Sequence, residues 1–97
     1  MNLLTVVASF KARPGLEEKA REALLALVEP TRKEPGCVQY DLHLSTDKPG
    51  EFLFFEKWVD RESLDQHLNM PYIHTLRGRV EELFLEPPDI RIYSRLI

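Results

Sequence analysis

Two short runs in this sequence combine a strand-like composition with apolar side chains on both faces, and they constrain the fold more than any other feature. Residues 3–10 (LLTVVASF) are apolar and β-branched, and residues 51–58 (EFLFFEKW) are rich in aromatic side chains. Alternate side chains of a strand point to opposite faces, so Phe52 and Phe54 should lie opposite Leu53. Both faces of the predicted sheet therefore need a cover.

Two other regions carry the period of an amphipathic helix. In the first, apolar residues recur along one stripe over residues 16–28, and Pro30 should kink or end the helix because it lacks a backbone donor. In the second, Pro71 separates a short helical piece that ends near residue 69 from a longer piece over residues 72–84. Both regions should pack their apolar stripes against a sheet.

Two further strands complete the pattern. Residues 37–45 (CVQYDLHLS) alternate between apolar and polar side chains, and the turn-forming residues 46–50 predict that the chain returns as a hairpin. Residues 90–96 (IRIYSRL) form the last predicted strand. The apolar face of the second strand is expected to carry Val38, Tyr40, Leu42 and Leu44.

The resulting order is βαββαβ within one domain spanning residues 1–97. This order predicts an α+β, ferredoxin-like fold, with a four-stranded antiparallel sheet and both helices on one face. The other face would normally meet water, yet here it carries large apolar side chains. We expect a second copy to cover it, giving a homodimer through the sheet faces, although single exposed side chains could also be tolerated.

The composition excludes several classes of function. A formal charge of −3 argues against nucleic-acid binding, and Arg77 and the other late arginines are interpreted as scattered surface residues. Cys37 is the only cysteine, and His67 and His74 are separated by a proline, so no metal site is expected. No signal peptide or membrane-spanning run is recognised, so we expect a cytoplasmic protein without a membrane partner.

Glu56 is the most informative polar residue because it lies among aromatic side chains, where an unpaired carboxylate is costly. It should therefore pair with a cation, or lie beside a pocket as an acid, a base or an orienting group. Trp58 offers a flat apolar wall with one N–H donor, suited to core packing or to a planar ligand. His67 is interpreted either as a structural histidine or as a partner of Glu56 or of a ligand.

These residues belong to an ordered set of short motifs that extends over almost the whole chain. The set resembles the antibiotic biosynthesis monooxygenase family of dimeric α/β barrels, including its quinol monooxygenase-like members. It consists of Arg13-Pro14-Gly15, Glu34-Pro35-Gly36-Cys37, Tyr40-Asp41-Leu42-His43, Glu56-Lys57-Trp58 and His67.

The resemblance implies a homodimer whose sheets meet to form a barrel, and a pocket between the sheet and the helices of each subunit. It implies oxygenation of small quinol-like or phenolic compounds with no cofactor, because the substrate anion itself reduces dioxygen. The implied catalytic residues are His67 and Glu56. The implied substrate-binding residues are Trp58, Phe54, Phe52 and Tyr72.

The chain departs from some relatives at positions that matter for substrate choice. Haem-degrading relatives have an Asn on strand one and a His on the last helix, where this chain has Ala8 or Ser9 and Arg77, so haem degradation is disfavoured. Many relatives have a His after the helix break, where this chain has Tyr72. A non-catalytic dimer that binds a small metabolite, and an isomerase or decarboxylase with the same acid and base, stay open as alternatives.

Overall fold

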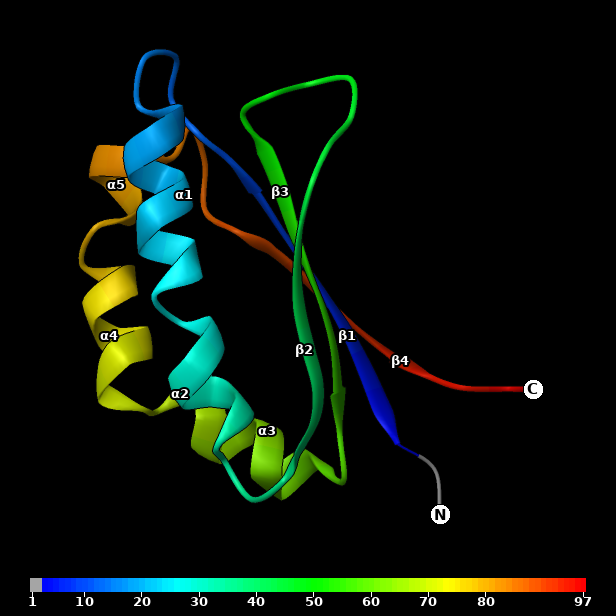
Figure 1. Cartoon of the computed structure of the whole chain (residues 1–97). Coiled ribbons are helices and arrows are strands. Elements are labelled where there is room, and N and C mark those ends of the chain that lie inside the picture. Colours follow the sequence, from blue (N-terminus) through cyan, green and yellow to red (C-terminus); the bar gives the residue numbers. More distant parts are fainter. Residues whose placement is uncertain (1–2) are drawn as a thin grey trace.

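The computed structural model describes residues 3–97, which form one sheet and a layer of helices (Figure 1). The chain alternates strands and helices in the predicted order, with each helical region broken into shorter helices. The elements are β1 (Leu4–Lys11), α1 (Glu17–Leu25), α2 (Val28–Arg32), β2 (Cys37–Leu44), β3 (Glu51–Trp58), α3 (Arg61–Leu68), α4 (Pro71–Arg77), α5 (Val80–Leu83) and β4 (Asp89–Ser94).

The sheet has the strand order β2-β3-β1-β4, and its neighbouring strands are antiparallel. All the helices lie on one side of it, as Figure 1 shows, and the opposite face is left without a covering layer in this single chain. This is the predicted α+β, ferredoxin-like fold, and the sequence-based fold class is confirmed. None of the helices within residues 3–97 is long and apolar enough to cross a membrane.

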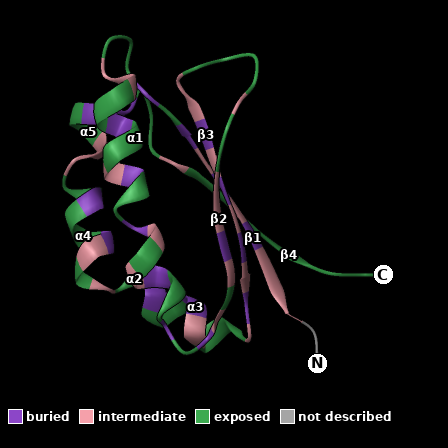
Figure 2. Ribbon diagram, viewed as in Figure 1, coloured by how far each residue is buried: buried purple, intermediate pink, exposed green. Residues whose placement is uncertain are grey.

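The central strand β3 shows why the two faces differ in burial (Figure 2). Its side chains alternate between buried and half-buried along all eight residues, as the sequence pattern predicts. The buried set faces the helices and forms the centre of the core with Val6, Ala8 and Phe10 of β1. The buried residues of β3 are Phe52, Phe54, Glu56 and Trp58.

Strand β2 differs from the prediction at one residue, Val38. The register with β3 shifts between Cys37 and Gln39, so that Val38 is an extra residue in a bulge and is 51% exposed. The prediction that Val38 shares the buried face was therefore wrong. Past the bulge the alternation holds, and Tyr40 and Leu42 lie opposite Glu56 and Phe54 on the helical side.

Prolines and a glycine divide the helices. Pro30 lies in the first turn of α2, where its missing N–H needs no partner. Ala26 and Leu27 keep right-handed helical dihedrals, but the helix is divided there because Pro30 cannot donate a hydrogen bond back to that turn. Pro71 separates α3 from α4 as predicted, and it is itself the first residue of α4, one residue before the predicted start. The predicted longer piece is interrupted at Gly78, a poor helix former, so α5 is separate from α4.

Strand β4 is exposed along its whole length because the helices do not extend over it (Figures 1 and 2). Ile90 and Ile92 pair with Ala8 and Val6 of β1, which places them on the helical side of the sheet. The core beneath the helices is therefore open along this edge, and Ile90 contributes to the cavity described below.

Candidate active site

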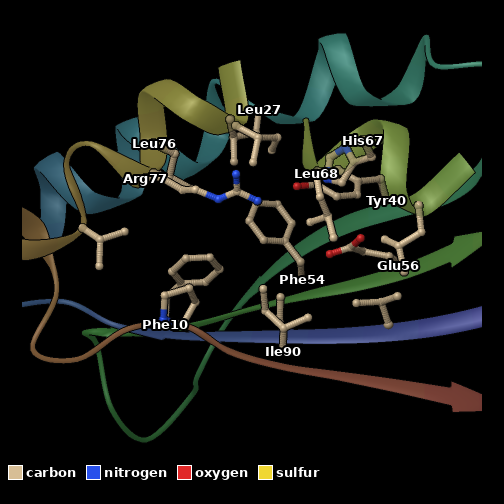
Figure 3. Close-up of a pocket in the computed structure, with 16 residues that line it drawn as sticks. Phe10, Leu27, Tyr40, Phe54, Glu56, His67, Leu68, Leu76, Arg77 and Ile90 are labelled. Carbon is tan, nitrogen blue, oxygen red and sulfur yellow. The ribbon is translucent and has the colours of Figure 1, made fainter. Parts of the chain in front are cut away.

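A cavity of about 70 Å³ lies between the helical side of the sheet and α3, α4 and α5 (Figure 3). Its walls are mostly apolar, and the ring of Phe54 projects into it from β3. The polar side chains in its lining are those of Tyr40, Glu56, His67 and Arg77. A small apolar space with a few polar groups is the usual form of a ligand site.

Glu56 is held in this cavity by the pleat of β3. Its side chain points to the helical side with its neighbours Phe54 and Trp58, and the residue is only 4% exposed. The carboxylate accepts one hydrogen bond from Trp58 Nε1, with an N–O distance of 2.9 Å. Burial raises the pKa of Glu56 to about 7, although the Trp58 bond acts in the opposite direction. Glu56 can therefore take up or release a proton near neutral pH.

His67 is held by a carboxylate that the sequence patterns did not single out. Glu34, in the turn between α2 and β2, accepts a hydrogen bond from His67 Nδ1 at 2.8 Å and a second one from the Tyr72 hydroxyl, both on Oε2. Glu34 is 8% exposed and His67 is 3% exposed, so these two side chains are nearly dry, whereas Tyr72 is half-buried. A buried carboxylate with two donors is well satisfied, and it orders α3 and α4 against the turn.

The Glu34 contact decides which nitrogen of His67 can act in the cavity. Because Nδ1 donates to the carboxylate, a neutral imidazole presents an unprotonated Nε2 as an acceptor. Burial lowers the pKa of His67 below its usual value, against the opposing influence of Glu34, so the ring is neutral near pH 7. His67 lines the cavity, and within residues 3–97 its Nε2 makes no hydrogen bond. It has the form of a base supported by a carboxylate.

The turn carrying Glu34 comes close to α3 because Gly36 has no side chain. A Cβ at Gly36 would lie 2.2 Å from the Cβ of Ser63, in the first turn of α3. The backbone is tied to the same place by the bond from Val59 N to Gly36 O, at 3.0 Å. The close approach brings Glu34 to the same helix that carries His67.

The predicted site residues fall into two groups in the structure. Glu56, His67 and Phe54 line the cavity together. Trp58 is fully buried behind it, with its ring centroid 4.6 Å from that of His67, and Tyr72 reaches Glu34 rather than the cavity. Phe52 is buried in the core but is not part of the lining. Glu56 bonds Trp58 and His67 bonds Glu34, so the two candidate catalytic groups are held separately.

Metal binding has no support in the side-chain arrangement. In the described part of the chain, residues 3–97, no three side chains of His, Cys, Asp or Glu are grouped so that they could hold a metal ion. Cys37 is half-buried, and burial together with the nearby carboxylates raises the pKa of its thiol to about 11. Its thiol is therefore protonated at neutral pH and a poor nucleophile.

Comparison with known proteins gives a family match over most of the chain. Residues 3–79 match the family model described as antibiotic biosynthesis monooxygenase. The chain belongs to this family. The matched region includes the turn at Glu34, the strand carrying Glu56 and Trp58, and the helices carrying His67 and Tyr72.

Several relatives are similar over nearly the whole chain. A crystal structure of PA3566 from Pseudomonas aeruginosa has 34% identity and a TM-score of 0.95, covering 100% of this chain and 97% of that one. Rv0793 of Mycobacterium tuberculosis, provisionally named a monooxygenase, is 37% identical over 96% of this chain and 91% of its own length. An uncharacterised Synechocystis protein is 33% identical over 94% of this chain, which spans 62% of that protein's length. The family and the name of the Mycobacterium protein support a monooxygenase role.

Glu34 is a residue of the candidate site that sequence reasoning missed. It appeared only within the motif Glu34-Pro35-Gly36-Cys37, with no role of its own. Its partners lie 33 and 38 residues further along the chain, so no local period connects them. A glutamate placed directly before a turn-forming Pro-Gly pair, ahead of a half-buried strand, was the one available signal.

Proposed function

We propose that this chain is a cofactor-independent monooxygenase that oxygenates a small quinol-like or phenolic compound in the cavity beneath its helices. The observation that carries the proposal is the combination of an apolar cavity with two buried groups that can exchange protons, Glu56 and His67. Such a site can hold a flat substrate and exclude water. It can also remove the proton of a phenol hydroxyl, and this deprotonation activates the phenol toward oxygen. The family assignment supports the same reaction class.

Three of the four polar side chains in the lining, those of His67, Glu56 and Tyr40, have a role in this proposal. His67 Nε2 accepts the proton of a substrate hydroxyl, and the Glu34 carboxylate stabilises the imidazolium that forms. The electron-rich substrate anion then reduces dioxygen, and protonated Glu56 supplies a proton to the reduced oxygen. One oxygen atom enters the ring and the other leaves as water, so that a quinol and dioxygen give a hydroxylated quinone and water. Tyr40 and Phe54 hold the ring, with their own rings stacked at a centroid distance of 4.6 Å.

Cavity size supports a substrate with a single ring. The volume of about 70 Å³ is smaller than the ~150 Å³ of an engineered apolar cavity that holds benzene. One ring can enter only if part of it extends toward the open edge near Pro88 and Ile90. Fused polycyclic substrates and haem are too large for this space.

A dimer is part of the proposal because the sheet face away from the helices is apolar. Val7 of β1 and Leu53 and Phe55 of β3 lie on this face, where the single chain leaves them only half-buried. A second copy of the sheet would bury them at ~25 cal/mol per Å² of apolar surface. We expect sedimentation equilibrium at micromolar concentration to give twice the mass of 11.3 kDa. A stable monomer there would contradict the dimer.

Oxygen uptake tests the reaction. We expect the protein to accelerate oxygen consumption over autoxidation with at least one quinol in a panel of single-ring hydroquinones and catechols. His67→Ala should lower the rate by about 100-fold, the usual contribution of a general base. His74→Ala is the matched control, because His74 lies exposed on α4 and outside the cavity lining.

Two outcomes would contradict the assignment. Uptake no faster than autoxidation across the panel, combined with ligand-dependent thermal stabilisation, would indicate a binding protein instead. Substrate conversion that continues at the same rate under argon would indicate an isomerase or decarboxylase. Equal rates for His67→Ala and His74→Ala would remove the proposed base while leaving the reaction in place.

A further inference from the structure

One cation in the cavity lining has no role in the reaction described above. Arg77 is the last residue of α4, and its side chain extends into the cavity toward the ring of Phe54 (Figure 3). Within residues 3–97 its guanidinium makes no hydrogen bond and no ion pair, whereas the neighbouring Arg79 contacts Glu82 at 3.5 Å. From the sequence, both were interpreted as scattered surface arginines. In the structure, Arg77 lines the cavity and Arg79 does not.

The surroundings of Arg77 make it suited to an anionic ligand. The side chains beside it in the lining are apolar, including Leu27, Leu76 and Val80, so its donors have no protein acceptor there. A guanidinium presents a planar fork of N–H groups that matches a carboxylate with two parallel hydrogen bonds. The chain as a whole carries a net charge of −3, so attraction for an anion at this point is local and not a property of the whole surface.

Figure 3 also shows how a ligand would be oriented. Arg77 approaches Phe54 from one side of the cavity, and Glu56 and His67 lie on the other side. A ring placed along Phe54 therefore has a cation at one end and two proton-accepting groups at the other. Arg77 is exposed, so it lies at the open side of the cavity, where the part of a ring that the 70 Å³ space does not enclose would extend.

We infer that the ligand is a single-ring phenol carrying a carboxylate, with the carboxylate on Arg77 and the hydroxyl directed toward Glu56 and His67. The reaction of this ligand rests on the proposed monooxygenase function, whereas its binding does not. An uncharged quinol would fill the cavity equally well but would leave the exposed guanidinium with water as its only partner. The carboxylate is therefore the feature that determines specificity.

Calorimetric titration with two ligands of nearly equal shape tests the inference without oxygen chemistry. We expect 4-hydroxybenzoate to bind on the order of tenfold more tightly than 4-hydroxybenzamide, because a charge-assisted pair replaces a neutral contact. Arg77→Gln should remove this preference by weakening only the benzoate, and Arg77→Lys should retain part of it. Arg79→Gln is the matched control and should keep the full preference.

The outcomes separate this inference from the proposed reaction. Equal affinities for the two ligands in the unmodified protein, or a preference unchanged in Arg77→Gln, would overturn it. A second measurement compares oxygen uptake with 2,5-dihydroxybenzoate and with hydroquinone. If the charge preference is found in binding but neither compound is oxidised, the anion site stands and the monooxygenase proposal fails. If hydroquinone is oxidised at the same rate as 2,5-dihydroxybenzoate, the reaction stands and the carboxylate inference fails.

Discussion

Replacing Glu34 with alanine is expected to lower the free energy of unfolding by about 3 kcal/mol, because two donors would lose their acceptor. His67 Nδ1 and the Tyr72 hydroxyl both bond Glu34 Oε2, and His67 is nearly fully buried, with no other hydrogen-bond partner for Nδ1 within residues 3–97. Water cannot easily replace the carboxylate in a site that is this dry. Urea denaturation followed by circular dichroism measures the change.

Glu34→Gln is the matched variant, since the amide oxygen can accept from both donors while the negative charge is lost. We expect it to keep more than half of the stability lost in Glu34→Ala. It should also lower the pKa of His67 further, because the carboxylate that raises this pKa is gone. The imidazole signals of His67 in a proton NMR titration report that change. Equal stabilities for the unmodified protein and Glu34→Ala would show that the cluster does not hold α3 and α4 in place.

Stability should fall as the pH rises from about 4.5 to 7, owing to Glu56. Burial raises its pKa from 4.5 to about 7 in the folded chain, so between these values the folded state holds a proton that the unfolded state has released. The unfolded state binds fewer protons there, and the free energy of unfolding decreases with pH. At 1.36 kcal/mol per unit, the loss is about 3 kcal/mol, complete above pH 7.

Glu56→Gln isolates this effect from other groups. His67 has a lowered pKa and acts with the opposite sign over part of the same range, so the unmodified curve alone would understate the contribution of Glu56. The amide retains an acceptor for Trp58 Nε1 and has no charge to bury. We expect Glu56→Gln to be more stable than the unmodified protein at pH 8, and equal or less stable at pH 4. Parallel curves across this range would mean that Glu56 is not a buried acid.

The fold could be predicted from the sequence because its signals are local. Burial on β3 alternates residue by residue, and Pro71 begins a helix, since both effects depend on neighbours along the chain. The face shared by Phe54, Glu56 and Trp58 follows from the same period of two. The pattern therefore placed Glu56 in the core and marked it as a residue that needs an explanation. The bulge at Val38 has no such local signal, and the prediction failed there.

Only the tertiary structure decided how the polar residues are paired. The sequence suggested Glu56 as a partner for His67, yet Glu56 bonds Trp58, two residues away on its own strand, and His67 bonds Glu34 from a distant turn. The sequence pattern predicts a surface arginine at Arg77, whereas in the structure α4 places Arg77 in the cavity lining. Periodicity determines the face on which a side chain lies. The group that it meets across the core depends on how close the elements approach, here on Gly36 beside Ser63.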